Sequence, residues 1–429
     1  MEITVISGII IFVGIFIIIS TELINKTIAA LVGAGLFLVL HLVKTSEAIE
    51  AIDWEVIFLL VSMMILIGIT KTTGLFQWIA IKTAKFARGE PMVILILLSL
   101  ITAVLSAFLD NVTTILILSP ITILIAVELG ISPVPFIVSL AIASNIGGTA
   151  TLIGDPPNIM IGVKAGFSFL DFVLTLGPLI LILLVVLIFA LWIFFHKKMV
   201  VSNERKARIM GFDETRSIEN VPLLTKSIIV LSLVIVGFLI HDYLGLDPAA
   251  IALIGAALML LLTFQKNIHD YLGEVEWETI FFFIGLFMMV GGLESLGVIS
   301  SLSKVMLQFT NGNIENTSYL ILWFSGIFSA LVDNIPYVAT MIPLISNIGQ
   351  TVDLGVSITP LWWSLAIGAC LGGNGTMIGA SANVVAVGIA NRNGFKISFW
   401  DFTKYGALIT VINLAISTLY VQNFIIYLK

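Results

Sequence analysis

Residues 144–158 read SNIGGTATLIGDPPN, and this polar stretch lies between the apolar runs 136–143 and 159–163. Three glycines, two prolines and the carboxylate of Asp155 interrupt what would otherwise be a hydrophobic helix. Non-helical backbone inside a bilayer leaves amides and carbonyls unpaired, so it persists only where it lines a protein cavity. The stretch therefore predicts a broken membrane helix whose ends contribute to a binding site.

The whole chain has the composition of an all-α polytopic membrane protein. Its 429 residues are 59% hydrophobic and 11% charged, with a mean hydropathy of +1.14, whereas soluble domains carry about 25% charged residues. Many apolar runs approach the roughly 20 residues that cross a bilayer, and they lack the alternation of β-barrel strands. The first run, 5–19, has no basic segment before it and is predicted to be a span rather than a signal peptide.

Several function classes find no support in the sequence. The chain has no P-loop motif, and its single cysteine, Cys370, excludes an internal disulfide and a cysteine-based metal cluster. Its four histidines show no ligand spacing, and no nucleophile–base constellation is visible. We therefore expect no enzyme activity, no nucleic-acid partner and no cofactor other than a coupling ion.

The sequence repeats itself, which is common among transporters. Four blocks recur in the same order at offsets of 222–225: 32–34 with 254–256, 53–58 with 276–281, 106–111 with 329–334, and 147–151 with 372–376. This repetition predicts three parts: a first transmembrane repeat at 1–196, a basic linker at 197–222 and a second repeat at 223–429.

Each repeat is predicted to contain five transmembrane helices and one re-entrant hairpin. The spans are predicted near 4–20, 24–43, 54–71, 133–163 and 170–196, and near 226–242, 247–264, 277–294, 360–390 and 400–425. The hairpins are the apolar segments 91–128 and 317–350, which an Asp-Asn pair interrupts. An odd number of spans inverts the second repeat relative to the first.

The distribution of basic residues predicts the orientation in the plasma membrane. The loop 197–226 is the most basic and should be cytoplasmic, which places both termini outside. Five spans per half then put 16 of the 20 basic residues inside, all except Lys44, Lys164, Lys304 and Lys429. Six spans per half would move the basic cluster at 71–88 outside.

Asp110 and Asp333 are the strongest candidates for ion coupling. A charge at the bilayer centre costs roughly 2.5–3.5 kcal/mol even on the lenient insertion scale. Each aspartate could simply cap a helix, but a serine would cap without a charge. Asp155 is predicted to be an N-cap followed by Pro156 at the first helical position.

The predicted substrate- and ion-binding residues come from the two hairpin tips and the two broken helices: Asp110, Asn111, Thr113, Thr114, Asn145, Gly147, Gly148, Thr149, Thr151, Asp155, Asn158, Asp333, Asn334, Gly372, Gly373, Asn374, Thr376, Ser381 and Asn383. The glycines, with Gly375, are expected to allow turns and close backbone approach. The coupling ion is predicted to be a proton or Na⁺, with Na⁺ near the two Asp-Asn pairs.

At these motifs the chain resembles the ion transporter superfamily, specifically its arsenite-permease and P-protein branch, which is related to citrate and divalent-anion transporters. Residues 109–114 resemble that branch's first hairpin tip, 145–158 its first broken helix and 371–383 its second. The resemblance implies secondary active transport by an elevator movement of the hairpin and broken-helix units. It also implies a homodimer.

The substrate is the least determined part of the prediction. Relatives that carry di- and tricarboxylates hold a Ser-Asn-Thr motif at the hairpin tips, and here Asp110 and Asp333 stand at the serine positions. The first hypothesis is proton-coupled efflux of arsenite or antimonite, for which an external ATPase subunit could supply energy. The alternatives are a sodium/proton antiporter, a sodium-coupled organic or inorganic anion carrier, and a channel.

Overall fold

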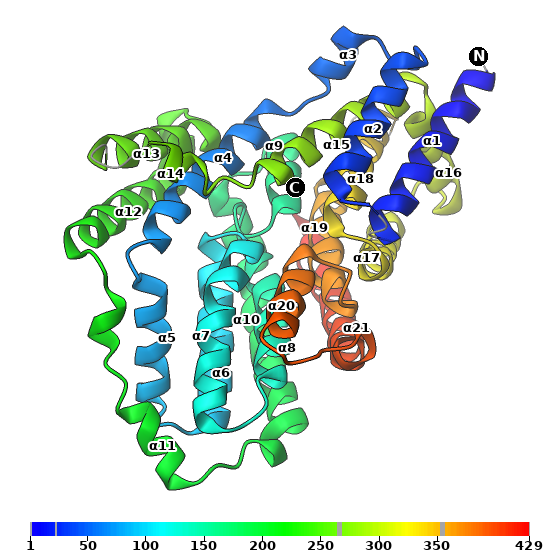
Figure 1. The fold of residues 1–429 in the computed structure, drawn as a ribbon. Coiled ribbons are helices and arrows are strands. Elements are labelled where there is room, and N and C mark those ends of the chain that lie inside the picture. The colour runs from blue at the N-terminus through cyan, green and yellow to red at the C-terminus, as the bar shows by residue number, and fades with distance from the viewer. Residues whose placement is uncertain (1, 22–23, 264–267, 352–356, 429) are drawn as a thin grey trace.

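The computed structural model describes residues 2–21, 24–263, 268–351 and 357–428, and the regular structure in these ranges is helical (Figure 1). Lys266 and Lys429, which the orientation argument assigned to opposite sides, lie outside the described residues. The first half contains α1 (Glu2–Thr21), α2 (Lys26–Val39), α3 (Thr45–Glu50), α4 (Trp54–Lys71), α5 (Leu75–Phe86), α6 (Pro91–Phe108), α7 (Asn111–Leu129), α8 (Val134–Gly148), α9 (Pro156–Ala165) and α10 (Phe169–Phe195).

A short helical linker joins the halves: η1 (His196–Lys198), α11 (Asn203–Met210) and η2 (Glu214–Ser217). The second half contains α12 (Val221–Leu244), α13 (Pro248–Leu262), α14 (Ile268–Leu272), α15 (Trp277–Ser295), α16 (Val298–Phe309), α17 (Ile314–Leu331), α18 (Asn334–Thr351), α19 (Thr359–Gly372), η3 (Gly373–Gly375), α20 (Ser381–Arg392), α21 (Phe399–Asn423) and η4 (Ile425–Tyr427).

The order of helices repeats between the halves, so that α1 to α10 correspond in turn to α12 to α21. Details of the helix ends repeat as well. Helices α5 and α16 each follow a glycine in the left-handed conformation, Gly74 (φ 80°) and Gly297 (φ 76°). Helices α10 and α21 each begin with a Ser–Asp capping box, at Ser168 and Ser398. The inverted orientation of the second half stays a prediction.

The two halves interlock, because the main helix contacts between them are reciprocal. Helix α2 packs on α15, and the equivalent helices α13 and α4 pack on each other. In the same way α20 packs on α7, and its counterpart α9 packs on α18. In Figure 1, α1 and α2 lie on one side of the central helices and α12 and α13 on the other.

Each Asp-Asn pair joins two helices that lie in contact, α6 with α7 and α17 with α18. The first helix of each pair packs on the first part of the broken helix of its own half, α6 on α8 and α17 on α19. The four helices of these two hairpins, which we call their arms, are 18 or 19 residues long. Such arms are about as long as a span, so the re-entrant topology also stays a prediction.

Eight helices of the described residues are long and apolar enough to cross a membrane: α1, α4, α6, α7, α10, α12, α15 and α21. The predicted spans 24–43 and 247–264 are shorter than expected, because they hold only the 14-residue α2 and the 15-residue α13. The end of α2 explains the first difference, since His41 adopts a positive φ of 52° and turns the chain. Both short helices pack on other helices of the protein.

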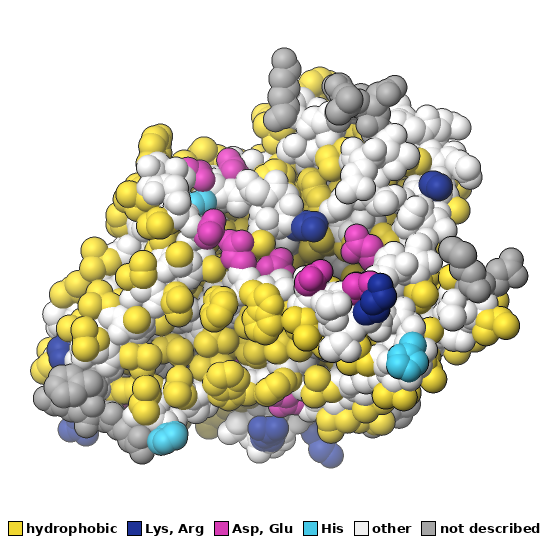
Figure 2. Space-filling view, turned by 90° about the horizontal axis from the view of Figure 1, so that it is seen from above, with side chains coloured by type: hydrophobic (Ala, Val, Ile, Leu, Met, Phe, Trp, Pro, Cys, Tyr) yellow, Lys and Arg dark blue, Asp and Glu magenta, His cyan; other side chains and the backbone are white. Residues whose placement is uncertain are grey.

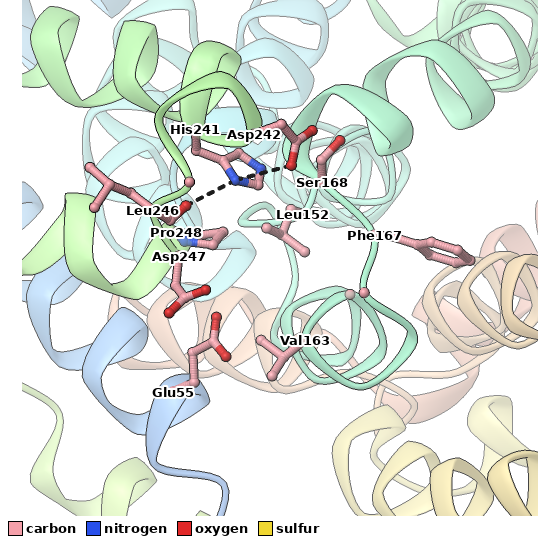
Figure 3. A pocket seen from close by; sticks show the side chains of 13 residues that line it. Glu55, Leu152, Val163, Phe167, Ser168, His241, Asp242, Leu246, Asp247 and Pro248 are labelled. Carbon is pink, nitrogen blue, oxygen red and sulfur yellow. Dashed lines mark hydrogen bonds and ion pairs between the residues drawn. The ribbon is translucent and has the colours of Figure 1, made fainter.

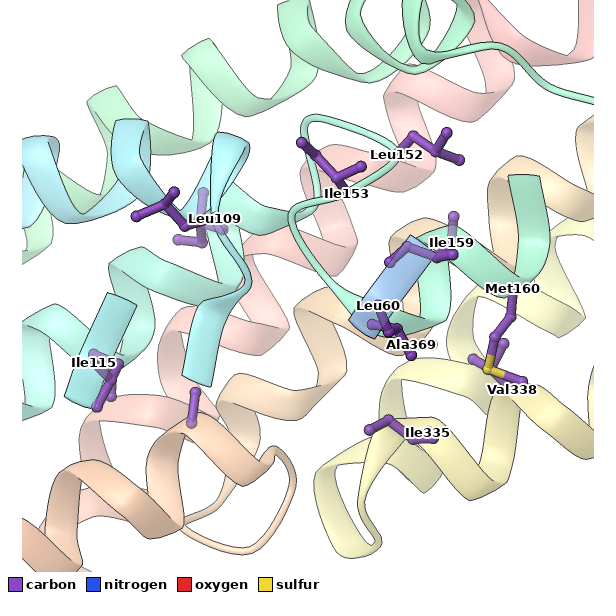
Figure 4. Packing of buried hydrophobic residues seen from close by; sticks show 14 of the residues in the cluster. Leu60, Leu109, Ile115, Leu152, Ile153, Ile159, Met160, Ile335, Val338 and Ala369 are labelled. Atoms are coloured by element: carbon purple, nitrogen blue, oxygen red, sulfur yellow. The ribbon is translucent and has the colours of Figure 1, made fainter. Parts of the chain in front are cut away.

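Apolar side chains surround the helix breaks (Figure 4). Leu60 of α4, Ile159 of α9 and Val338 of α18 are almost fully buried, and so is Ala369 of α19. These residues come from both halves and exclude water around the polar breaks. A low-dielectric surrounding strengthens every electrostatic interaction that the breaks make.

The linker packs against the first half of the protein and forms ion pairs with it. Lys206 of α11 forms an ion pair with Glu90 (2.5 Å), and Glu214 of η2 pairs with Lys85 (2.5 Å). Ile209 of α11 is fully buried. The hydrogen bond from Lys85 is the main reason that the pKa of Glu214 falls from 4.5 to about 2. In Figure 1 the linker crosses the ends of α5, α6 and α7 at the foot of the molecule.

Candidate functional site

Both hairpin tips place an aspartate at the start of the second arm. Asp110 Oδ1 accepts the backbone N–H of Thr113 at 2.8 Å, and Asp333 Oδ1 accepts that of Ile335 at 3.1 Å. The residues before them, Leu109 and Val332, are extended and end the first arms. Each aspartate therefore fills the capping role that was considered as its simplest function. Capping accounts for one carboxylate oxygen of each residue.

The two broken helices leave carbonyl groups without helical partners, and an asparagine crosses each break to satisfy them. Asn158 Nδ2 donates to the carbonyls of Gly148 (3.2 Å) and Thr151 (2.9 Å). Asn383 Nδ2 donates in the same way to the carbonyls of Gly373 (2.8 Å) and Thr376 (2.9 Å). Both asparagines are fully buried. These side chains allow the breaks to exist inside an apolar protein.

Asp155 occupies the predicted position but makes a different contact. It directly precedes Pro156, the first residue of α9, yet its side chain does not cap the helix. Instead, Asn334 Nδ2 of the opposite half donates to Asp155 Oδ2 at 3.1 Å. The two prolines at the start of α9 lack N–H groups, which removes donors that an N-cap would normally engage. Asp155 is 1% exposed, so this contact lies deep in the protein.

Gly147, Gly148 and Gly372 serve close packing and lie within helices. Gly147, Gly148 and Gly372 remain helical, and none of the predicted site glycines has a positive φ. The first helix therefore breaks after Gly148, later than expected, whereas the second leaves the α-helical conformation at Gly373. A Cβ on Gly147 would lie 2.1 Å from the carbonyl oxygen of Ala103, and one on Gly372 would lie 2.5 Å from that of Gly326. The expectation of close backbone approach is thus confirmed. The expectation of unwinding is wrong for Gly147 and Gly148, which stay in α8, whereas Gly373 lies beyond the end of α19 in the 3-10 turn η3.

Serine and threonine hydroxyls form hydrogen bonds between each hairpin and the broken helix of its own half. The donors occupy equivalent positions in the two halves. Four such bonds are present: Ser106 to the carbonyl of Ser144 (2.7 Å), Thr151 to that of Ala107, Ser329 to that of Ala369 (2.6 Å), and Thr376 to that of Ala330 (2.5 Å). Each hairpin and broken helix therefore forms one hydrogen-bonded unit.

An asparagine network joins the two units at the breaks. Asn145 Nδ2 donates to both Asn374 Oδ1 (2.9 Å) and Asn383 Oδ1 (3.0 Å) of the second half. Asn111 Nδ2 at the first hairpin tip donates to Asn145 Oδ1 at 3.0 Å. In the equivalent place of the second half, Cys370 Sγ donates to Asn158 Oδ1 at 3.4 Å. The structure thus brings five predicted asparagines and a cysteine that was not predicted together at the breaks.

Asp333 forms an ion pair that the sequence did not reveal. Lys26 Nζ lies 3.1 Å from Asp333 Oδ2 and donates to Ser381 Oγ at 2.7 Å, and Ser381 donates to the same Oδ2 at 2.5 Å. Lys26 begins α2, and it was assigned to the cytoplasmic surface as one of many basic residues. A lysine at a span start gives no other local signal.

Asp110 has no such partner. Within the described ranges, no lysine or arginine forms an ion pair with it, and one charged neighbour is Glu276 at the start of α15. Asp155 lies close enough to both Asp110 and Asp333 to interact with them electrostatically. Among the described residues, Asp110, Asp155, Asp333 and Glu276 are therefore electrostatic neighbours, and Lys26 pairs with Asp333. No three His, Cys, Asp or Glu side chains of the described residues are close enough to hold a metal ion together.

The three remaining predicted residues are less clearly placed. Thr149 hydrogen-bonds within its own helix, to the carbonyl of Asn145 at 2.7 Å. Thr113 contributes its backbone amide to the cap of Asp110. The buried hydroxyl of Thr114 has no partner among the described residues. The arrangement leaves the binding role of all nineteen predicted residues as a prediction.

Two cavities flank α9, and the first reaches the break that precedes this helix. One, of about 380 Å³, is lined by Leu152 of the first break, Glu55 of α4 and the turn that carries His241 and Asp247 (Figure 3). The other, of about 440 Å³, is lined by Met160 and Lys164 of α9 and by residues of α4, α15 and α18. Figure 2 shows acidic side chains gathered along the face of the molecule opposite α11.

Paired broken helices and hairpins within an all-helical protein that has many spans define the class of membrane transporters. The chain belongs to the citrate transporter family, whose model matches residues 15–368. It is a secondary transporter and not an enzyme. This assignment confirms the predicted place in the ion transporter superfamily.

The chain is similar over almost its whole length to mycobacterial proteins. It is 45% identical to an uncharacterized transporter of Mycobacterium tuberculosis and 43% identical to a 46 kDa membrane protein of Mycobacterium leprae, with 96% of each chain covered. It is 32% identical to the human P protein, where the match covers 96% of this chain and 59% of the relative. The predicted relation to the P protein is thereby confirmed.

Among solved structures, the YdaH transporter of Alcanivorax borkumensis has a similar fold. The TM-score is 0.50, with 13% sequence identity, 85% of this chain covered and 84% of the other. This likeness concerns the fold alone.

Proposed function

We propose that the protein is a proton-coupled antiporter for a small inorganic solute that carries positive charge or none. Arsenite and antimonite, as neutral hydroxides, are the first substrates to test. The observation that carries this proposal is the charge balance of the breaks: Asp155 interacts electrostatically with Asp110 and Asp333, and among the described residues only Lys26 forms an ion pair with one of the three. A site of this kind favours protons, metal cations and neutral hydroxyl compounds over free anions.

The same observation supports sodium/proton antiport as a second candidate. Asp110 keeps one carboxylate oxygen free of the capping bond, and the network beside it offers amide oxygens. Carboxylate and amide oxygens are suitable ligands for a hard cation. In this candidate, Na⁺ and H⁺ would compete for Asp110.

The family description names citrate, and free citrate fits the site poorly. A trianion would meet the carboxylates of both hairpin tips at short range in an apolar surrounding, where repulsion between like charges is strong. Citrate could enter as a complex with a metal cation, which reduces its charge. This possibility makes citrate, with and without Mg²⁺, a necessary part of any substrate test.

We further propose that transport follows an elevator movement. The transport unit would contain the hairpins and broken helices, α6–α9 and α17–α20, and the scaffold would contain α1–α4 and α12–α15. The cavities beside α9 lie between these two groups of helices and leave room for relative movement. Scaffold helices would form the interface of a homodimer, with both termini outside and the linker in the cytoplasm. An external ATPase subunit would dock at the linker.

A substrate screen in proteoliposomes tests the proposed function. Purified protein is given arsenite, antimonite, Na⁺, citrate and Mg²⁺-citrate separately, with pH and sodium gradients imposed one at a time. The expected result is movement of arsenite or Na⁺ that depends on the pH gradient. Uptake of free citrate driven by sodium, without proton movement, would contradict the proposal.

A further inference from the structure

Lys26 is held in place on the scaffold before it reaches the hairpin tip. Its two neighbours bind the start of α15: Asn25 donates to the side chain of Glu278, and Thr27 donates to the carbonyl of Glu278 at 2.8 Å. The ammonium group of Lys26 also lies 5.1 Å from the ring centre of Phe282. The side chain is therefore directed from a fixed helix start, and 29% of it remains exposed.

The ammonium group occupies a site that has the composition of a cation site. It is bound by the carboxylate of Asp333 and the hydroxyl of Ser381, which also bond to each other. These two ligands come from the hairpin tip and from the start of the second part of the broken helix. Carboxylate and hydroxyl oxygens are suitable ligands for a hard cation, and helix breaks are where transporters place such sites.

The first half lacks this arrangement. At the repeat offsets, Pro248 corresponds to Lys26 and Pro156 corresponds to Ser381. Neither proline offers a cation or a hydroxyl. Asp110, the counterpart of Asp333, accordingly has no ion pair in the described ranges. Each half therefore has an aspartate at its hairpin tip, but in the described residues only the aspartate of the second half, Asp333, pairs with a lysine.

We propose that Lys26 is a built-in cation that permanently fills the coupling-ion site of the second half. The transporter would then bind only one exchangeable proton or cation per cycle, at Asp110 of the first half. Because Lys26 belongs to α2 and Asp333 to the hairpin, the pair also holds the scaffold to the transport unit in this conformation. The stoichiometry of one exchangeable ion per cycle rests on the proposed function. The occupation of the Asp333 site by Lys26 does not.

The test is cation binding by the Lys26→Gln variant, followed by thermal unfolding in detergent. Removing the ammonium group leaves Asp333 and Ser381 to take a free cation. The apparent Tm of Lys26→Gln should rise with the logarithm of the Na⁺ or Li⁺ concentration, at constant ionic strength set with choline. The wild-type protein and Lys26→Arg should show a clearly smaller rise. An equal response of Lys26→Gln and wild type would overturn the proposal.

Two further variants keep the test decisive if Lys26→Gln is poorly folded. Asp333→Asn alone leaves Lys26 without its partner and should lower the Tm, and Lys26→Gln in the same chain should restore part of that loss. The double variant should show no gain from Na⁺. A double variant less stable than the sum of the two single losses would contradict the ion pair. Since no transport is measured, these results are independent of the proposed substrate.

Discussion

Asn145 Nδ2 lies 3.0 Å from Asn383 Oδ1, although the two residues are 238 positions apart in the chain. Cys370, which corresponds to Asn145 in the repeat, makes the reciprocal contact to Asn158. Each broken helix therefore reaches across to the asparagine that closes the other break. This crossed pair joins the two halves at the predicted site.

Asn145→Ala should destabilise the protein by ~1–3 kcal/mol, because Asn111, Asn374 and Asn383 would each lose a buried hydrogen-bond partner. Unfolding of the purified protein in detergent, followed by near-UV circular dichroism, measures this loss. Cys370→Ser is the matched control, since it keeps a donor toward Asn158. Equal stability of the two variants would mean that the network contributes little.

Gly147→Ala should abolish most transport and lower the apparent Tm, because its Cβ would collide with the backbone of Ala103. Backbone cannot turn away as a flexible side chain can, so the helices must separate. Gly388 of α20 is the control: a Cβ there meets nothing within 4 Å. Gly388→Ala should be neutral or stabilising by up to ~1 kcal/mol. Similar behaviour of both variants would refute the steric explanation.

Docking of the linker should not depend on pH near neutrality. The pKa of Glu214 is lowered to about 2 in the folded protein, so its contribution to stability is fully present above its unfolded value of 4.5. That contribution is lost as the pH falls from 4.5 toward 2. Hydrogen exchange of residues 203–217, corrected for intrinsic rates, should therefore be the same at about pH 5 and about pH 8.

Glu214→Gln should raise the exchange of this segment at all these pH values, because Lys82 and Lys85 would lose their partner. Asp213→Asn serves as control, since Asp213 is exposed, its ion pair is with the neighbouring Arg216, and asparagine can still accept the Thr215 N–H that caps η2. Unchanged exchange in Glu214→Gln would show that the ion pairs do not hold the linker.

The predicted orientation can be tested by labelling with a reagent that does not cross membranes. In a Cys370→Ser background, Ser202→Cys should react only after the cells are opened, and Asn313→Cys should react in intact cells. Both positions are exposed in the structure. Reaction of Ser202→Cys from outside would refute the cytoplasmic linker and the predicted orientation.

Local chemistry made much of this site predictable. The Gly, Pro and Asp residues of 144–158 cannot continue an apolar helix, and the same is true of the Asp-Asn pairs, so the positions of the breaks follow from the sequence. The repeat then predicted which breaks correspond. The structure agrees with both, including the start of α9 at Pro156 and the caps at Asp110 and Asp333.

Long-range contacts could not be predicted from a single sequence. Lys26 and Asp333 are 307 positions apart, and nothing near Lys26 distinguishes it from a lysine at the membrane surface. Cys370 resembles an ordinary buried cysteine, and only its correspondence to Asn145 could have indicated a role. Unwinding was wrongly predicted at Gly147 and Gly148, because a turn and a close packing contact both require glycine. Only the positions of neighbouring helices separate these two causes.

In the proposed antiport, Asp110 is the residue that exchanges the coupling proton, so its asparagine variant is the most direct test of the mechanism. Proton movement during substrate-driven exchange is measured with a pH-sensitive dye inside proteoliposomes, for wild type and Asp110→Asn. The variant should remain folded, because asparagine can still cap α7. We predict that it moves no protons in response to substrate. Proton movement at the wild-type rate in folded Asp110→Asn would contradict the account.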